Sequence, residues 1–394
     1  MNKLLYFLTL IVGILAYLYF DVLVKTVATD IHPHSEQVQN INNGIKNLPP
    51  NFLYYTMVWL LSGFSADLVK IKGVSIIILA ISIALKFGVT QYIIKDYLKH
   101  SFHKILTNSQ LYIIYFLSVL LILVFTIPDA WYYASHRQFY YLGRLVPNVW
   151  HNSTIIFLMP FALLLFWEQY CILFFDKKIN FLRLSLLIFI NIVIKPSFFF
   201  IYLMVTPFFL LYIFRFKKEF WQNIYPILFG GILILLQTYL IFVLKAGLLV
   251  KDETSIEISS AFKVWQIFMP EKYIFNGLLN TFALPMGFII LFAKNIYKSP
   301  KLAIFVTSLG FAAVLLFCFV AEGGERMVHG NFFWQCIVAS YIIFMAVVME
   351  SLKIFFSPNA THKWRFLILA ILLALHVGSG CFYLSRILEI KSYL

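Results

Sequence analysis

The sequence has little charge for its length. Only 12% of its 394 residues are Asp, Glu, Lys or Arg, whereas 62% are hydrophobic and 19% are aromatic. Soluble domains have about 25% charged and roughly 45–50% apolar residues, so this composition excludes a soluble globular enzyme. The excess of apolar side chains indicates a protein that faces lipid.

The sequence is also poor in cysteine. Its four cysteines, Cys171, Cys318, Cys336 and Cys381, all lie in apolar runs, and none belongs to a CxxC pair. This pattern supports neither a disulfide framework nor a zinc ribbon. The formal charge of +14 does not indicate nucleic-acid binding, because basic residues in a membrane protein first reflect its orientation.

Long apolar runs occupy most of the chain. A helix needs about 20 apolar residues to cross the roughly 30 Å core of a bilayer, and only helices satisfy their own backbone polar groups there. We predict an all-α fold, a polytopic transmembrane helix bundle of about 11 spans that forms a single integral membrane domain over residues 1 to 394. The predicted spans are residues 3 to 24, 73 to 94, 111 to 127, 154 to 175, 181 to 194, 197 to 214, 224 to 245, 275 to 293, 302 to 320, 332 to 350 and 366 to 384.

Two apolar stretches are ambiguous. Residues 51 to 66 are short of a standard span, so they form either a short transmembrane helix or a helix that lies in the interface. We favour the interfacial helix, because the lysines between residues 95 and 104 then fall in the cytoplasm. Lys195 and Pro196 interrupt the run from 181 to 214, which is either one kinked helix or a tight hairpin.

The distribution of charge favours one orientation. With the N-terminus in the cytoplasm, short cytoplasmic segments of about 59 residues in total hold 16 of the 31 Lys and Arg residues. The first run is longer than the roughly 7–15 residues of a secretory signal, so we interpret it as an uncleaved anchor. Most acidic residues fall outside, where the longest segments are 25 to 72 and 246 to 274. We therefore expect carboxylate chemistry on the extracytoplasmic face, in lids and pockets.

The first outer segment carries a dense group of ionisable residues. Asp30, His32, His34 and Glu36 lie within seven positions, and we predict that they are catalytic. A carboxylate that is partly desolvated at a bilayer surface is a stronger base than one in water, so Asp30 is the candidate general base. The alternative is that these are ordinary loop residues near headgroups. His and carboxylate side chains can also bind Zn²⁺ or Mn²⁺, so metal binding is a further alternative. Pro33 separates the histidines and is expected to break any helical i, i+4 ligand pair, and no metal ligand is assigned.

A second group lies in a glycine-rich turn at residues 321 to 335. Its ionisable residues are Glu322, Glu325, Arg326 and His329. Glycine allows close approach of a ligand, and the planar fork of Arg suits phosphate or carboxylate. We predict an anion site here, and the alternative is a polar turn with an internal Glu/Arg pair.

Further candidates for binding a substrate or phosphate lie at the ends of predicted spans. Lys195 lies at the outer apex of the predicted hairpin among apolar residues, where it either snorkels or binds an anion. His151 and Asn152 precede the span that starts at residue 154. Arg144 lies among tyrosines and tryptophans, which either form an interfacial belt or stack on sugar rings.

The order of these features resembles that of the GT-C glycosyltransferases, and more narrowly the compact bacterial members that act with cell-surface polysaccharide machinery. An anchor helix, an outer segment that opens with an acid, the sequence PPNFLYY, a Lys-Pro hairpin and about a dozen spans carry the resemblance. It implies a bacterial inner or plasma membrane location, a polyprenyl-phosphate-linked sugar donor and a glycan or glycolipid acceptor. It also implies that Asp30 is the base and that Lys195 and Arg326 hold the donor phosphate.

The chain departs from that family in two respects. Ile31 follows Asp30 where many relatives have a second acid, which leaves the need for a divalent metal open, and no other cofactor is expected. The large C-terminal soluble domain of some relatives is missing, so the acceptor is expected to bind among the loops.

Two other functions fit the same pattern. The first is a polymerase of lipid-linked polysaccharide repeat units, although four outer arginines are few for two pyrophosphate lipids. The second is a lipid or solute transporter, although the sequence shows no repeated halves. Lys86 and Glu168 lie inside predicted spans and are secondary candidates, since ionisable residues within a membrane are generally functional.

Overall fold

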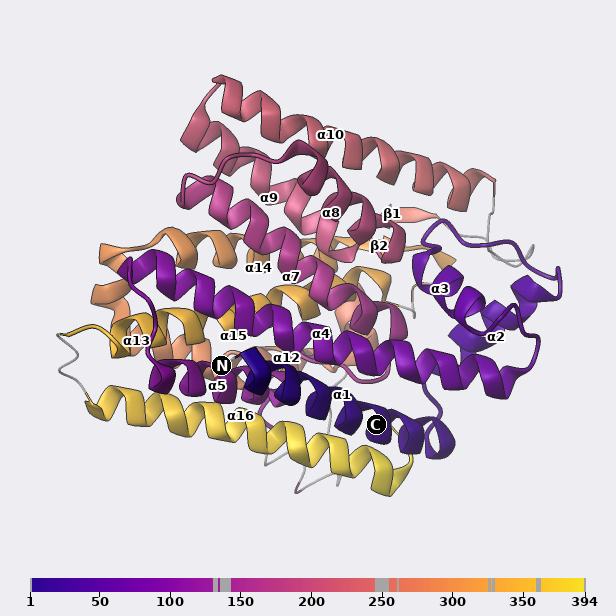
Figure 1. The fold of residues 1–394 in the computed structure, drawn as a ribbon. Coiled ribbons are helices and arrows are strands. Elements are labelled where there is room, and N and C mark those ends of the chain that lie inside the picture. The colour runs from indigo at the N-terminus through magenta and orange to yellow at the C-terminus, as the bar shows by residue number, and fades with distance from the viewer. Residues whose placement is uncertain are drawn as a thin grey trace.

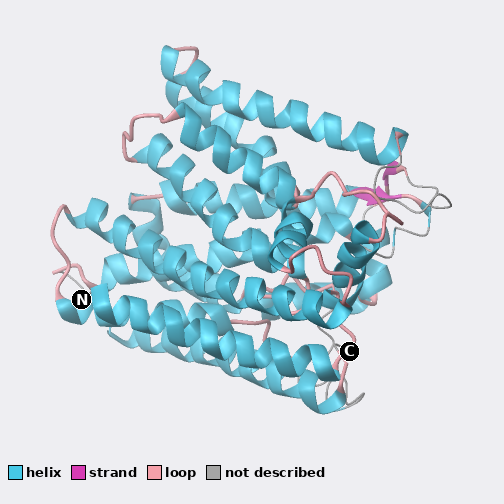
Figure 2. Ribbon diagram, turned by 45° about the vertical axis from the view of Figure 1, so that its right-hand side comes forward, coloured by secondary structure: helices cyan, strands magenta, loops and turns pink. Residues whose placement is uncertain are grey.

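The computed structural model describes residues 2–129, 134, 143–244, 255–260, 262–324, 327, 330–358 and 363–392. Helices make up nearly all of the regular structure in these residues, and they pack side by side in one bundle (Figures 1 and 2). The predicted all-α bundle is therefore confirmed.

Every predicted apolar run contains a helix. Eight helices among the described residues are long and apolar enough to cross a membrane, so the protein is an integral, multi-pass membrane protein. These eight are α1 (Asn2–Thr26), α4 (Leu68–Phe102), α7 (Ser153–Phe174), α9 (Ser197–Phe214), α10 (Lys218–Thr238), α14 (Lys301–Phe319), α15 (Trp334–Phe355) and α16 (Lys363–Ile390).

Two of the predicted spans, 111 to 127 and 275 to 293, differ from the helices that form, whereas α8 (Phe181–Ile194) matches the predicted span 181 to 194. Helices α5 (Asn108–Leu123) and α8 are apolar but short. The run from 275 to 293 is not one straight helix, because α12 (Glu271–Thr281) and α13 (Ala283–Lys298) meet at an angle of 63°. These two helices together form either one broken span or a re-entrant loop.

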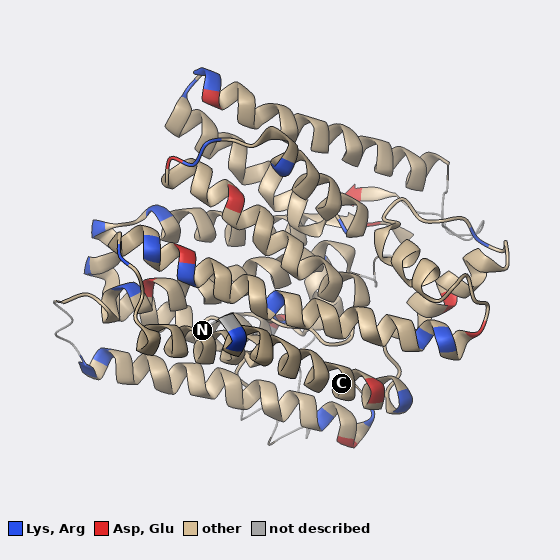
Figure 3. Cartoon of the chain, viewed as in Figure 1, with Lys and Arg blue, Asp and Glu red and all other residues tan. Residues whose placement is uncertain are grey.

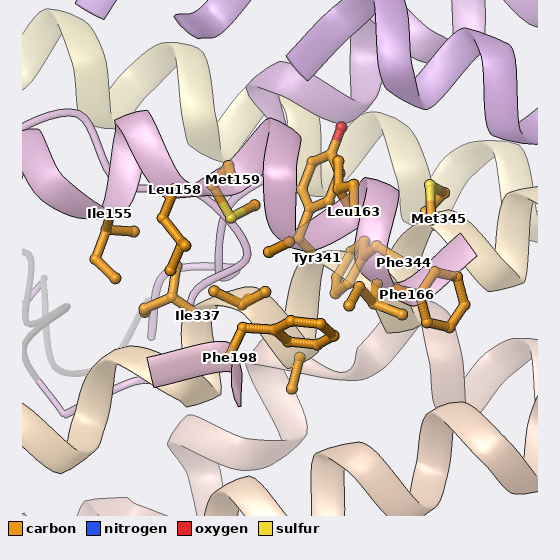
Figure 4. Packing of buried hydrophobic residues seen from close by; sticks show 14 of the residues in the cluster. Ile155, Leu158, Met159, Leu163, Phe166, Phe198, Ile337, Tyr341, Phe344 and Met345 are labelled. Carbon is orange, nitrogen blue, oxygen red and sulfur yellow. The ribbon is translucent and has the colours of Figure 1, made fainter. Parts of the chain in front are cut away.

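The centre of the bundle is formed by α7 and α15. In each, 83% of the most apolar window is buried, against 17% in α1 and α10, which lie at the periphery and leave apolar side chains for lipid. Figure 4 shows side chains from these two helices and from α9 packed together. The labelled residues are Ile155, Leu158, Met159, Leu163, Phe166, Phe198, Ile337, Tyr341, Phe344 and Met345.

The run from 181 to 214 forms a hairpin. Lys195 follows the last residue of α8 in an extended conformation, and Pro196 precedes α9. The Lys195 side chain reaches Thr154 in the first turn of α7, whereas Phe209, late in α9, packs on Phe174 at the last turn of α7. Because α9 starts where α8 ends and then runs to the other end of the bundle, the hairpin alternative is confirmed.

Short elements gather at one end of the bundle, which we call the α2–α3 end (Figure 1). Helix α1 ends and α4 begins there. Lys and Arg lie mostly toward the two ends of the bundle and are sparse between them (Figure 3). The short elements at the α2–α3 end are α2 (Ile31–Asn42), α3 (Leu53–Leu61), β1 (Ile256–Ile258), β2 (Val320–Glu322), α11 (Lys263–Phe268) and the 3-10 helix η3 (Asn331–Phe333); a π-helix, η1 (Tyr239–Val243), ends α10.

The helices α2 and α3 occupy the segment predicted to carry interfacial helices. With nine residues, α3 is too short to cross a bilayer. The expectation that Pro33 breaks a helix is wrong, because α2 runs through it. Pro33 lies in the first turn, where a backbone N–H has no helical partner and its loss costs little.

The chain between α5 and α7 is buried without being helical in residues 124–126 and 143–152. His376 of α16 supports the first of these segments. Its Nδ1 donates to the Phe125 carbonyl oxygen at 2.6 Å, and its Nε2 accepts from the Leu284 backbone N–H at 3.3 Å. Irregular backbone is tolerated at membrane depth when protein groups satisfy it in this way.

Candidate functional site

Residues from four distant segments approach each other at the α2–α3 end. Asp30 precedes α2, Asn152 precedes α7, Lys195 lies at the turn between α8 and α9, and Glu322 ends β2. The carboxylates of Asp30 and Glu322 both act electrostatically on Lys195. We call Asp30, His34, Asn152, Lys195 and Glu322 the polar cluster.

Asp30 holds the N-cap position of α2 but does not cap it. A capping Asp normally accepts a hydrogen bond from a backbone N–H in the first turn, which stabilises the helix by about 1 kcal/mol. Here no such side-chain bond forms. The carboxylate instead accepts a hydrogen bond from Asn152 Nδ2 at 2.8 Å. The orientation of Asp30 is therefore set by a residue 122 positions away and not by its own helix.

Asn152 is fixed by α7. Its Oδ1 accepts from the Ile155 backbone N–H at 3.1 Å, which caps α7, and from the Thr154 hydroxyl at 3.0 Å. Since the amide oxygen is held by these two donors, the amide nitrogen must point the other way, toward Asp30. The start of a buried helix thus positions the carboxylate.

Lys195 places a positive charge in the same cluster. Its ammonium donates to Thr154 Oγ1 at 3.3 Å and lies 4.8 Å from the ring centroid of Trp334. Within the described part of the chain, no carboxylate approaches it closely enough for a direct ion pair. Burial lowers the pKa of Lys195 to about 8, although the charges of Asp30 and Glu322 act in the opposite direction.

His34 lies on the same face of α2 as Asp30. Its Nδ1 forms a hydrogen bond of 2.7 Å with the hydroxyl of Tyr55 on α3. Desolvation and the charge of Lys195 lower the pKa of His34 to about 4, and Asp30 raises it. His34 is therefore a neutral ring at physiological pH, held in place by α3.

His151 is buried beside the cluster. Its ring centroid lies 6.0 Å from that of Trp334, and burial lowers the pKa of the imidazole while Asp30 raises it. The predicted pair of His151 and Asn152 is thus brought close to the predicted base. Its chemical role stays a prediction.

Three of the predicted residues have other surroundings. The ring of His32 bonds the carbonyl oxygen of Val27 at 3.2 Å, and Glu36 is exposed on α2. Arg144 is buried and donates to the Ile127 carbonyl oxygen at 3.1 Å. The charge that acts on Arg144 comes from Asp129. These surroundings do not bring His32, Glu36 or Arg144 into the polar cluster.

The glycine-rich turn is described only in part. Glu322 accepts a hydrogen bond from Asn331 at 2.7 Å, and its backbone pairs with Ile256 of β1. Glu325, Arg326 and His329 lie outside the described residues. Their predicted role in phosphate binding stays a prediction.

Three side chains that contact the polar cluster, Tyr55, Thr154 and Trp334, were not predicted as site residues. Thr154 is predicted only as the start of a span, whereas Tyr55 lies in the predicted interfacial segment and Trp334 in the glycine-rich turn, and neither is assigned a role there. Composition gives no signal that separates an aromatic ring beside a cation from one in a belt. For Thr154, the spacing N-x-T at residues 152–154 places two polar side chains in the first turn of a helix, which was an available signal.

The cluster combines an oriented carboxylate, a cation and neutral imidazoles. Among the described residues, no group of three or more His, Cys, Asp or Glu lies close enough to hold a metal ion. The carboxylate can accept a proton from a hydroxyl, and the ammonium can stabilise an anionic oxygen. No protein-family model matches this chain, and no curated protein matches its sequence closely enough to count as a relative.

Proposed function

We propose that the protein is a membrane glycosyltransferase that moves a sugar from a polyprenyl-phosphate donor to a glycan or lipid-linked acceptor. The observation that carries this proposal is the orientation of Asp30. Its carboxylate does not cap its own helix, where the Thr29 hydroxyl accepts from the Ile31 backbone N–H at 3.2 Å, and is held by Asn152 in the cluster that contains Lys195. A carboxylate held by a second side chain that is itself fixed by hydrogen bonds is typical of a functional site.

The reaction requires one proton acceptor and one stabilised leaving group. Asp30 accepts the proton of the acceptor hydroxyl, whose oxygen forms the new bond to the sugar. The bond between the sugar and the phosphate oxygen breaks, and its electron pair stays on that oxygen. Lys195 lies where a cation stabilises the departing phosphate.

The surroundings of the cluster fit a substrate with a lipid tail. Asp30 follows a membrane-spanning helix of which little is buried, and Lys195 lies at the turn of an apolar hairpin. If the phosphate binds in the polar cluster, the attached polyprenyl chain lies between the membrane-spanning helices. We place the cluster on the extracytoplasmic face, because the basic residues are denser in the segments at the other end of the bundle.

Transfer by purified protein in lipid nanodiscs tests this proposal. A polyprenyl-phosphate sugar is supplied with a mixture of envelope glycolipid acceptors, and products are analysed by mass spectrometry. We expect the addition of one sugar, and a rate at least about 100-fold lower for Asp30→Asn, because the amide cannot take the proton. Full activity of Asp30→Asn would reject Asp30 as the base.

Asp67→Asn is the matched control. Asp67 caps α4 by accepting from the Val69 backbone N–H at 2.9 Å, and Asn is as good a cap as Asp. This variant removes an outer carboxylate at equal size and is expected to keep full transfer. A ladder of products would instead identify a polymerase, and uptake of labelled donor into sealed vesicles without any glycosidic product would identify a transporter.

A further inference from the structure

The imidazole of His34 takes no part in the reaction proposed above. The ring is half-buried on α2, one helical turn after Asp30, and its Nδ1 lies 2.7 Å from the hydroxyl of Tyr55 on α3. Among the described residues, its Nε2 has no hydrogen-bond partner. One ring nitrogen is therefore held by the protein, and the other is open to a ligand.

Tyr55 determines which nitrogen of His34 carries the proton. Tyr55 is 7% exposed, and His34 Nδ1 is the one hydrogen-bond partner of its hydroxyl in the described part of the chain. Burial raises the pKa of this hydroxyl, so it keeps its proton, and a buried O–H needs an acceptor. Nδ1 is therefore the acceptor, and in the neutral imidazole the proton is then on Nε2.

The surroundings of His34 keep it a donor of fixed direction. The ring is neutral at physiological pH, because burial and the charge of Lys195 disfavour the imidazolium. It also packs on two tyrosine rings of α3, at centroid distances of 6.0 Å for Tyr54 and 5.6 Å for Tyr55. A donor that is held in one direction before a ligand arrives loses little freedom on binding.

The ammonium of Lys195 places this donor near the phosphate of the proposed substrate. Of the charges that act on His34, that of Lys195 is stronger than that of Asp30. The ammonium has three N–H donors, and one of them goes to Thr154 Oγ1. A phosphodiester presents two unbridged oxygens, and phosphate sites in proteins combine several donors. A second donor beside Lys195 is therefore expected.

We propose that His34 Nε2–H donates a hydrogen bond to an unbridged oxygen of the donor phosphate, next to the ammonium of Lys195, and that Tyr55 fixes the tautomer that allows it. This inference rests on the proposed function, because it takes a lipid-linked phosphate as the ligand of the polar cluster. His34 stabilises the negative charge that the departing phosphate gains, whereas Asp30 takes the proton of the acceptor. His34 then acts as a donor and not as a general base.

Binding of farnesyl phosphate, a short polyprenyl phosphate, tests this contact. Isothermal titration calorimetry on the full chain in nanodiscs gives Kd for each protein. His34→Phe keeps a ring against Tyr54 and Tyr55 without the donor, and we expect Kd to rise about tenfold. His34→Gln places an N–H donor near the position of Nε2 and should recover most of the affinity. His32→Phe, on the same helix but outside the cluster, should bind like the wild type.

Farnesol separates the phosphate contact from the packing of α2. It has the same chain without the phosphate, and its Kd should be equal in wild type and His34→Phe. Equal weakening for both ligands would show that His34 only supports packing, and would overturn the inference. Equal Kd of wild type and His34→Phe for farnesyl phosphate would overturn it while leaving the donor site intact. If the wild type does not bind farnesyl phosphate, the donor site falls with it.

The tautomer is measured by nitrogen-15 NMR of protein labelled at histidine, with the His34 signals assigned by their loss in His34→Phe. We expect an unprotonated Nδ1 and a protonated Nε2 in the wild type. The Nε2–H resonance should move when farnesyl phosphate is added and stay in place with farnesol. Tyr55→Phe should show both tautomers and a Kd for farnesyl phosphate about threefold higher. A proton on Nδ1 in the wild type would overturn the inference.

Discussion

At the scale of single residues, the hydrogen bond from Asn152 to Asp30 is the contact on which the site depends. Asn152 both caps α7 and orients the carboxylate, so most substitutions would change two properties at once. Ser separates them, because it is an equally good cap but is too short to reach Asp30.

We therefore predict that Asn152→Ser lowers kcat for transfer about tenfold while KM and Tm stay near the wild-type values. Steady-state kinetics on the purified protein, with differential scanning calorimetry, check this. An unchanged kcat would mean that the orientation of Asp30 by Asn152 has no catalytic value.

Lys195 makes binding and stability depend on pH. With its pKa lowered to about 8, the ammonium loses its proton as the pH rises through 8, so KM for the donor should increase above that pH. Lys195→Arg should remove this increase, since Arg stays protonated. KM for the donor between pH 7 and pH 9.5 checks the prediction in both proteins, and an equal increase in both would contradict it.

The same lowered pKa has the opposite consequence for stability. Between pH 8 and the unfolded value near 10.5, the unfolded chain binds more protons at this residue than the folded protein does, so stability contributed by Lys195 increases with pH. The Tm of Lys195→Met minus the Tm of the wild type should therefore be largest at pH 7 and should decrease toward pH 10. A constant difference would show that burial does not penalise this charge.

Only some of the site residues could be selected from the sequence. Asp30 and His34 are four residues apart and share a face of α2, whereas His32 and Glu36 lie on another face. Pro33 was expected to break helical spacing between the histidines, so the sequence selected Asp30 as the candidate base but did not show which of the other three residues share its face. Recognition that proline is tolerated in a first turn would have separated them.

At the scale of elements, α16 and the C-terminal end of α5 are in close contact. Gly380 of α16 packs directly against the backbone of Leu123, and a Cβ at this position would overlap the carbonyl oxygen of Leu123. A Cβ at Gly378, on the same helix, would meet nothing within 4 Å.

We predict that Gly380→Ala lowers Tm strongly or prevents accumulation, whereas Gly378→Ala leaves Tm unchanged or raises it, because Ala is the better helix former. Fluorescence-detected size-exclusion chromatography after a heat series compares the two variants. Equal behaviour would indicate that α16 does not pack on the end of α5 as described.

Hydropathy located these elements but not their interruptions. Residues 124 to 127 are Val, Phe, Thr and Ile, which read as the end of a span. They are not helical, and His376 and Ser379 of α16 form hydrogen bonds with the carbonyl oxygens of Phe125 and Thr126. Such partners lie about 250 positions away, so no local pattern in the sequence could reveal the end of α5 at Leu123.

At the scale of the whole molecule, orientation determines which compartment the polar cluster faces. We predict that a membrane-impermeant maleimide labels Glu36→Cys in intact cells and does not label Lys104→Cys until the membrane is opened. Both positions are exposed. Glu36 lies on α2 at the α2–α3 end, where α4 begins, and Lys104 follows the other end of α4. The native cysteines are replaced first, because Cys381 is exposed. The reverse labelling would place the cluster in the cytoplasm.

The expectation that distant segments share one layer came from the alternation of the predicted spans. Asp30 and Glu322 both act on Lys195, which agrees with it, and the position of Arg326 stays a prediction. The individual contacts could not be foreseen. Which side chain of one loop meets which of another depends on the packing of α7 against its neighbours, and alternation does not fix that packing.

We propose that the polar cluster holds the phosphate of a polyprenyl-linked donor. The decisive measurement is electron cryomicroscopy of the wild-type protein in nanodiscs with added polyprenyl phosphate. We predict phosphate density in contact with the ammonium of Lys195, with the polyprenyl chain leaving between the spans. Phosphate density at the opposite end of the bundle, with none near Lys195, would contradict it.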